Sequence, residues 1–256
     1  MKNTGLALGG GAVLGAAHVG VLEAIDDFDI EINYIAGTSI GSLVAAFFAF
    51  GKDWKEIKKI AAELKWLSIT EISLSRYGLL SNEKLGKLII EHIGNKNFED
   101  SDIPLAMVAT DITSGEKVIL DKGSVADAVM ASTCIPGIFI PVEINGKMLV
   151  DGGIVENVPI KTTREMGAEY VIGVDLNAKH RYEKPDNILD VIINSFNFLM
   201  QQSAKLQAED ADILIKPDLG SFNMTDTDQV DELIKKGYKD SKKVLKKISL
   251  ETHKKS

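Results

Sequence analysis

Apolar segments of strand length alternate with longer, helically patterned segments along the first part of the chain. Thr4–Leu8 and Ile32–Ala36 are short apolar runs that predict strands. Ala16–Asp27 and Ile40–Phe50 follow them and have the length and apolar spacing of helices. Strands that alternate with helices are typical of a parallel sheet covered by helices. The pattern therefore predicts an α/β fold.

The same alternation continues to the end of the chain, with one hairpin signal at Thr113–Gly115. Further strands are expected at Pro104–Thr110, Lys117–Asp121, Met148–Val150, Tyr170–Val174 and Ile213–Lys216. Further helices are expected at Trp54–Leu64, Asn82–Ile93, Val125–Ala131, Thr162–Met166, Ile188–Ala208 and Gln229–Ile248. Trp66–Leu80 lacks a clean period and predicts a surface excursion. No repeat or low-complexity linker interrupts this order, so we expect one domain over residues 1–256: a three-layer fold whose mainly parallel central sheet has helices on both faces.

Composition places the chain among ordinary globular proteins, with 45% hydrophobic and 26% charged residues in 256. Cys134 is the only cysteine, which excludes an intrachain disulfide and a cysteine-rich metal site. The N-terminal segment lacks the apolar core of a signal peptide, and the longest apolar run, near Leu43–Phe50, is too short to cross a bilayer. We therefore expect a cytoplasmic protein.

Charge is distributed unevenly. The net charge is −8, but Lys235–Ser256 holds nine lysines against two acidic residues, so the rest of the chain carries −15. An acidic body argues against nucleic acid as a partner. The lysine-rich C-terminal segment has two interpretations: a solvated last helix, or a peripheral contact with anionic lipid headgroups.

A G-x-S-x-G sequence occupies Gly37–Gly41, between a predicted strand and a predicted helix. A serine on such a turn adopts a strained backbone that exposes its hydroxyl, and the neighbouring glycines avoid collisions across the turn. Ser39 is therefore the candidate nucleophile, with Gly37 and Gly41 forming its elbow.

A second glycine-rich loop, Gly9–Gly15, also joins a strand to a helix. Such a loop presents backbone N–H groups to an anion or to an oxyanion. The dinucleotide signature G-x-G-x-x-G fits in neither register, and no Gly-Lys-Ser/Thr follows for a phosphate-binding loop. Tight packing of strand against helix, with no ligand, is the alternative interpretation.

A nucleophilic serine needs a base, and the histidines offer little support for one. His18 lies within a predicted helix, His92 lies near a helix end and His253 lies in the lysine-rich segment, while His180 has no supporting pattern around it. Asp151 instead ends a predicted strand and precedes Gly152 and Gly153, which suits a general base acting directly on serine. Two other aspartates at strand ends are rival bases, Asp111 and Asp175.

Together these segments resemble the patatin-like phospholipases, over nearly the whole chain from Gly5 to about Gly237. The resemblance rests on the following blocks in the family's order and spacing: Leu8–Gly11, Gly15–His18, Gly37–Gly41, Ala131–Gly137, Asp151–Gly153 and Ala211–Pro217. It implies a Ser39–Asp151 dyad without a histidine, and no cofactor or metal ion. Oxyanion donors in that scheme come from three residues: Gly10, Gly11 and Ala12.

The resemblance also implies hydrolysis of a phospholipid, lysophospholipid or related lipid ester through an acyl-enzyme. Two alternatives stay open: transfer of the acyl group to an acceptor other than water, and a lipid-binding or regulatory protein on a weakened hydrolase scaffold. The glycine loop departs from the family in one place, because Leu14 stands where an arginine or lysine is usual. From this departure we expect weak headgroup recognition, and higher phospholipid turnover after Leu14→Arg.

Overall fold

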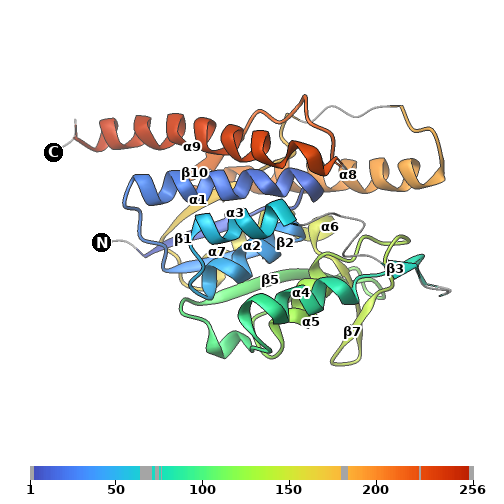
Figure 1. The fold of residues 1–256 in the computed structure, drawn as a ribbon. Helices are drawn as coiled ribbons and strands as arrows, with labels where there is room; N and C mark the ends of the chain where they lie inside the picture. The colour runs from blue at the N-terminus through green and yellow to red at the C-terminus, as the bar shows by residue number, and fades with distance from the viewer. Residues whose placement is uncertain are drawn as a thin grey trace.

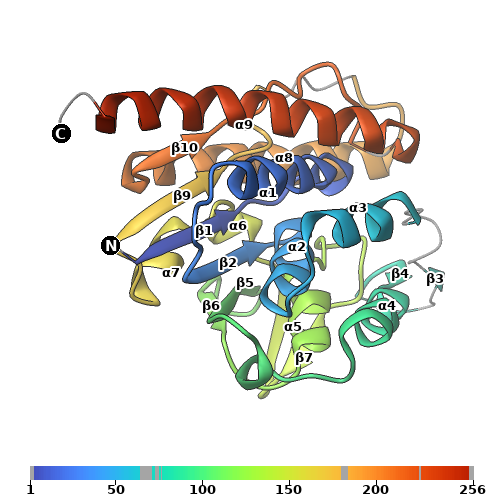
Figure 2. The same cartoon turned by 60° about the vertical axis from the view of Figure 1, so that its left-hand side comes forward.

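The computed structural model describes residues 3–63, 71–72, 75, 77–179, 184–224 and 226–253. These residues contain an eight-stranded sheet with the order β10-β9-β1-β2-β5-β8-β7, and β6 pairs with β5 outside this path. The strands are β1 (Thr4–Leu8), β2 (Tyr34–Thr38), β5 (Leu105–Asp111), β6 (Lys117–Leu120), β7 (Val142–Ile144), β8 (Lys147–Asp151), β9 (Tyr170–Val174) and β10 (Ile213–Ile215). Figure 2 shows the five mutually parallel strands β10, β9, β1, β2 and β5 in sequence across the sheet. The α/β fold with a mostly parallel sheet is thus confirmed.

The helices largely follow the predicted segments. They are α1 (Ala17–Asp27), α2 (Ile40–Ala49), α3 (Trp54–Glu63), α4 (Glu83–Ile93), α5 (Val125–Ser132), α6 (Gly153–Glu156), α7 (Ile160–Glu165), α8 (Ile188–Gln207) and α9 (Val230–His253). A short 3₁₀ helix, Ala12–Ala16, joins the glycine loop to α1. A small two-stranded sheet pairs β3 (Glu71–Ile72) with β4 (Leu80–Ser81). It lies within the predicted surface excursion, of which residues 66–70, 73, 74 and 76 lie outside the described part.

Alternation along β1 separates the two faces of the sheet. Leu6 and Leu8 belong to the large core cluster that includes side chains of α1, α2 and α9. Ala7 points the other way and packs with Ile160 of α7 and Ala204 of α8. Because successive side chains of a strand point to opposite faces, helices cover the sheet on both sides. The helix α2 is apolar all round, as expected of a helix enclosed between the sheet and other helices.

Close packing fixes α9 along α1, as Figure 1 shows. A Cβ on Gly20 of α1 would lie 2.0 Å from the carbonyl oxygen of Ile234, and a Cβ on Gly237 of α9 would lie 2.1 Å from that of Ala17. The two backbones therefore approach each other where each helix has a glycine. The predicted lysine-rich helix is a long helix that contributes Leu233, Ile234 and Leu245 to the core.

The register around β5 brings two strand ends together. Thr38 of β2 lies opposite Val108, and Asp151 of β8 lies opposite the next residue, Ala109. Both Val108 and Ala109 also pair with β6, which therefore occupies the other edge of β5. Hence β2 and β8 meet end to end along one edge of β5. Because β8 runs antiparallel to β5, both strands finish at the same point.

Sequence patterns missed two short elements, β7 and α6. Asn145 and Gly146 form the turn between β7 and β8, both with positive φ angles of 53° and 74°. An Asn-Gly pair is a recognised hairpin signal, but only three residues pair on each side. Segments this short give no reliable periodicity.

Candidate active site

Ser39 lies at the sharp turn between β2 and α2. Its backbone has φ 54° and ψ −129°, which places a non-glycine residue in a disfavoured region. The N–H of Ser39 donates a hydrogen bond to Oγ of Ser132 (2.9 Å), and that hydroxyl donates to the carbonyl oxygen of Val108 (2.7 Å). Ser132 thus ties the turn to the central strand β5 and helps to hold the strained conformation.

Both elbow glycines are required by close backbone contacts. A Cβ on Gly37 would lie 2.4 Å from the carbonyl oxygen of Gly41, and a Cβ on Gly41 would lie 2.1 Å from that of Leu8. These atoms belong to the backbone and cannot move aside cheaply. The turn therefore tolerates only glycine at the two positions, as the G-x-S-x-G pattern suggested.

Asp151 is fully buried at the end of β8. Its Oδ1 accepts a hydrogen bond from the N–H of Gly153 (2.8 Å), whereas Oδ2 forms no close, well-directed hydrogen bond. Burial raises the pKa of Asp151 to about 7, and the nearby hydroxyl of Ser39 and the N–H of Gly153 partly oppose that rise. The carboxyl group can therefore gain or lose a proton near neutral pH.

Gly152 and Gly153 allow the chain to turn directly after this carboxylate. A Cβ on Gly152 would lie 2.3 Å from the carbonyl oxygen of Val108, and one on Gly153 would lie 2.7 Å from Cγ of Met200. Side chains here would push Asp151 away from β5 or from α8.

The glycine loop lies against the nucleophile, since a Cβ on Gly10 would be 3.0 Å from Cβ of Ser39. The N–H of Gly10 donates to Asn157, to both its carbonyl oxygen and Oδ1 (3.2 Å each), and the Gly10 carbonyl accepts from Nδ2 of Asn177 (2.8 Å). His18 Nε2 donates to the carbonyl oxygen of Gly9 (2.7 Å). Two side chains from distant segments, Asn157 and Asn177, and one from the helix that follows the loop, His18, therefore set the path of this loop.

Two amides of the loop differ from that of Gly10 in their hydrogen bonding. Within the described part of the chain, the N–H groups of Gly11 and Ala12 have no hydrogen-bond partner, whereas the N–H of Gly10 is already engaged. Ala12 has a positive φ of 50°, an unfavourable region for a residue with a Cβ. Ala12 thus adopts, despite its Cβ, a backbone conformation that glycine more commonly adopts.

An apolar cleft opens beside Ser39. Side chains from five parts of the chain line it, and the residues are Ala12, Ser39, Ile40, Leu43, Asn82, Leu85, Thr133, Ile135, Phe139, Phe196, Asn197 and Met200. Most are hydrophobic, and the few polar ones could orient a ligand. Such a cleft suits a hydrocarbon chain that carries a reactive ester near Ser39.

The family model described as patatin-like phospholipase matches residues 6–164, which include the glycine loop, Ser39 and Asp151. The chain belongs to this family. It is 31% identical over 203 residues to an uncharacterised NTE family protein of Mycobacterium tuberculosis, covering 78% of this chain and 56% of that protein. It is 32% identical over 180 residues to the lysophospholipase NTE1 of Saccharomyces cerevisiae, covering 68% of this chain and 11% of that one. The match thus spans about half of the first relative and a small part of the second.

The fold has a counterpart among solved structures. The structure of VipD from Legionella pneumophila aligns with a TM-score of 0.56 at 16% identity, covering 96% of this chain and 67% of that one. At this identity the likeness concerns the patatin fold alone. The arrangement of the site in this family member therefore depends on its own residues.

The rival bases occupy other environments. His18 is completely buried, and burial lowers its pKa to about 4, so its imidazole is neutral and supports Gly9. The pKa of Asp111 is lowered mainly by the N–H of Thr113, and that of Asp175 is raised by burial. Neither carboxylate is influenced by Ser39, as Asp151 is. His180 and the side chain of His253 lie outside the described residues.

Leu14 corrects one expectation about this family member. The side chain of Leu14 is fully buried in the core. In this environment Leu14→Arg places an unpaired charge among apolar side chains, which destabilises the fold. The buried position of Leu14 therefore does not support the expectation that Leu14→Arg raises phospholipid turnover.

Sequence reasoning missed Asn157 and Asn177, the two amides that hold the glycine loop. Asn177 lies two residues beyond Asp175, just after β9, and a polar side chain at the carboxyl end of a parallel strand was the available signal. Asn157 closely follows Asp151–Gly153 but carried no pattern of its own. Within the described residues, no helix is long and apolar enough to cross a membrane and no cluster of three metal-ligating side chains occurs.

Proposed function

We propose that the protein hydrolyses lipid acyl esters with Ser39 as nucleophile and Asp151 as general base. The observation that carries the proposal is the meeting of β2 and β8 on one edge of β5. The strained Ser39 directly follows β2, and the buried Asp151 ends β8. Within the described residues, Oδ2 of this carboxylate has no hydrogen-bond partner, which supports the pairing. Membership of the patatin-like phospholipases supports the same chemistry.

In the first half-reaction, Asp151 accepts the proton of the Ser39 hydroxyl while Oγ attacks the ester carbonyl. The tetrahedral intermediate collapses with loss of the alcohol, which takes up the proton from Asp151 and leaves an acyl-enzyme. In the second half, Asp151 deprotonates a water molecule that attacks the acyl-enzyme. The second tetrahedral intermediate then collapses: the bond from Oγ of Ser39 to the acyl carbon breaks, Oγ takes up the proton from Asp151, and the fatty acid leaves. Atoms, charge and protons return to their starting state.

The negative oxygen of each intermediate needs hydrogen-bond donors. We assign this role to the N–H groups of Gly11 and Ala12, and the engaged N–H of Gly10 to the support of the loop. Loss of one such donor typically raises the barrier by about 2.7–4 kcal/mol. The bonds from Asn157, Asn177 and His18 are therefore part of the catalytic geometry, although these side chains need not touch the substrate.

The pKa of Asp151 suits a base. A carboxylate with a pKa of about 7 is a stronger proton acceptor than an ordinary one, yet a substantial fraction of it is still ionised at neutral pH. Proton transfer from Ser39 to Asp151 therefore requires no histidine.

The substrate class follows from the cleft. Its hydrophobic walls favour an ester with a hydrocarbon chain over a small polar ester. A lysophospholipid or phospholipid meets this requirement, and the similarity to a yeast protein named lysophospholipase supports the choice.

We further infer that the exposed side of α8 contacts the lipid surface. Phe196 and Met200 on its buried side line the cleft, while other large apolar side chains of the helix face solvent. These exposed residues are Ile188, Leu189, Val191, Phe198, Leu199 and Leu206. One helix would thus join the membrane surface to the cleft.

The lysine-rich end of α9 is less suited to that role. Lys236, Lys242 and Lys243 form ion pairs with Asp218, Asp27 or Asp240. Their charge is partly compensated within the protein, which favours a solvated helix. Residues 254–256 lie outside the described part.

Hydrolysis of medium-chain p-nitrophenyl esters tests the proposed chemistry. Ser39→Ala and Asp151→Asn should each reduce kcat by at least about 10³-fold, since loss of the nucleophile or base leaves only residual catalysis. Ser195→Ala, on the exposed side of α8, is the control and should retain wild-type rates. Full activity of Ser39→Ala would exclude the mechanism, and a product ester or thioester in place of fatty acid would identify a transferase.

A further inference from the structure

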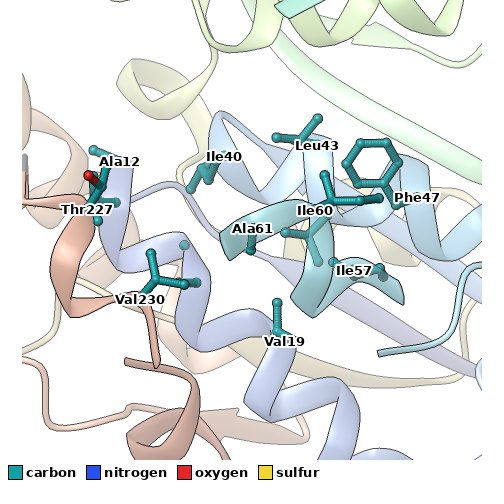
Figure 3. A pocket seen from close by; sticks show the side chains of 14 residues that line it. Ala12, Val19, Ile40, Leu43, Phe47, Ile57, Ile60, Ala61, Thr227 and Val230 are labelled. Carbon is teal, nitrogen blue, oxygen red and sulfur yellow. The ribbon is translucent and has the colours of Figure 1, made fainter. Parts of the chain in front are cut away.

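A second apolar cavity lies next to the cleft that contains Ser39. It is enclosed by α1 with its preceding 3₁₀ helix, by α2 and α3, and by the segment that begins α9 (Figure 3). Its volume is about 60 Å³, against about 10–15 Å³ that one water molecule requires. The cavity therefore has room for a few methylene groups, but not for a phospholipid headgroup.

The two cavities are contiguous. Ala12, Ile40 and Leu43 line both of them, so the second cavity adjoins the space in front of Ser39 at these three residues. Ala12 also carries one of the two amides assigned to the oxyanion. A carbonyl held at this amide thus lies at the junction of the two spaces.

Burial increases along the second cavity. Ala12, Ile40 and Ala61 are partly exposed. Phe47 and Ile57, at the other end of the group of side chains in Figure 3, are only 1% and 2% exposed. Ala16, Thr227 and Val230 are also partly exposed, so the open side of the cavity extends from the oxyanion loop to α3 and the start of α9, whereas its other end is closed and apolar.

Chemistry restricts what could fill this space. Among the side chains of the described residues that line it, only that of Thr227 has a polar atom. A charged or hydrogen-bonding group would lose its hydration here without gaining a partner. A hydrocarbon chain instead gains the free energy of burial, about 0.8 kcal/mol for each methylene, which corresponds to about four-fold in affinity.

We propose that this cavity holds the distal part of the acyl chain of the ester whose carbonyl lies at Ser39. The inference rests on the proposed esterase activity and adds a determinant of chain length to it. The acyl chain passes Ala12 and Ile40 and ends between α2 and α3. A short chain does not reach the cavity, so the cavity favours long acyl chains over short ones.

Filling the cavity tests the proposal. Ala61→Trp puts a large side chain into it from α3, and Ala62→Trp puts the same side chain on the exposed neighbouring position as a matched control. The measurement is the ratio of kcat/KM for p-nitrophenyl decanoate to that for p-nitrophenyl butanoate, both below their solubility limits. Ala61→Trp should lower this ratio on the order of 50-fold if three methylenes lose their burial, and Ala62→Trp should leave it within two-fold of wild type.

A second variant guards against misfolding of the first. Thr227→Phe narrows the same cavity from the opposite wall and should lower the ratio in the same direction. Hydrolysis of the short ester in each variant shows that the fold and the dyad are intact. Because Ser39→Ala should abolish turnover of both esters, failure of the esterase proposal is distinguishable from failure of this one.

An unchanged ratio in folded, active Ala61→Trp and Thr227→Phe would overturn the proposal. If these variants also lose inhibition by free decanoate, the cavity is a separate fatty-acid site.

Discussion

At the scale of single residues, burial of Asp151 determines how strong a base its carboxylate is. Its carboxyl group has lost its hydration and has one hydrogen bond from Gly153 in exchange. The chain therefore keeps a poorly stabilised anion next to Ser39. Active sites commonly hold such groups, because a carboxylate that its surroundings fully stabilise is a weak base.

The stability of the protein should reflect this group. The pKa of Asp151 is about 7 in the folded state and near 3.8 in the unfolded chain, so the folded state keeps a proton that the unfolded chain releases between these values. Stability therefore falls as pH rises from about 4 to 7 and then levels off. Asp151→Asn removes this pH-dependent loss of stability. The free energy of unfolding of the variant minus that of wild type should therefore be about 2–3 kcal/mol larger at pH 8 than at pH 5.

Urea unfolding at the two pH values measures the effect. Glu91→Gln, on the exposed surface of α4, serves as a control for removing one carboxylate. A difference between Asp151→Asn and wild type that does not change with pH would contradict a raised pKa.

Residues in local sequence patterns were predictable, whereas residues that act through distant contacts were not. Ser39 and Asp151 lie in local patterns dictated by tight turns, so each was predicted from its neighbours. The residues that hold Ser39 and the glycine loop in place were not predicted, because they are distant in sequence. Asn157 lies 147 positions from Gly10, and Ser132 lies 93 positions from Ser39. Hydrogen bonds of this kind depend on the assembled sheet.

At the scale of elements, glycine allows the close approach of α1 and α9. The periodicity of both helices was visible in the sequence, but their contact was not. The direction of β8 was equally hidden, since a short apolar run carries no sign of whether it pairs parallel or antiparallel. Yet this direction brings Asp151 to Ser39.

Two glycine substitutions in helices should separate contact from intrinsic helix preference. In Gly20→Ala the new Cβ meets the backbone of α9, and the free energy of unfolding should fall by about 1–3 kcal/mol. In Gly86→Ala of α4 it meets the flexible side chain of Met130, and better helix propensity should offset that contact. Thermal unfolding compares the two variants, and equal Tm values would contradict the glycine contact between α1 and α9.

At the scale of the whole molecule, apolar surface is concentrated on α8, which also lines the cleft. The sequence predicted a helix at Ile188–Ala208 but not which of its sides is buried. Phe196 and Met200 are buried, whereas Ile188, Val191 and Leu199 are exposed. A helix apolar on two sides has no single stripe from which to infer the buried face.

Binding to phosphatidylcholine vesicles tests the proposed role of this surface. Leu199→Glu should weaken binding about ten-fold, since one exposed leucine is no longer inserted among lipids. Ile112→Glu, an equally exposed apolar position on the β5–β6 hairpin, should leave binding unchanged. Flotation with vesicles measures both, and equal binding of the two variants would remove α8 from the contact.

The pairing of Ser39 with Asp151 is tested most directly by the rate of labelling with a fluorophosphonate as a function of pH. We predict one adduct per chain, on the peptide that contains Ser39. Its rate should rise about ten-fold per pH unit below pH 7 and level off above, as Asp151 ionises. In Asp151→Asn the rate should be at least about 10³-fold lower and lack this dependence. An adduct on another residue, or a wild-type rate in Asp151→Asn, would contradict the dyad.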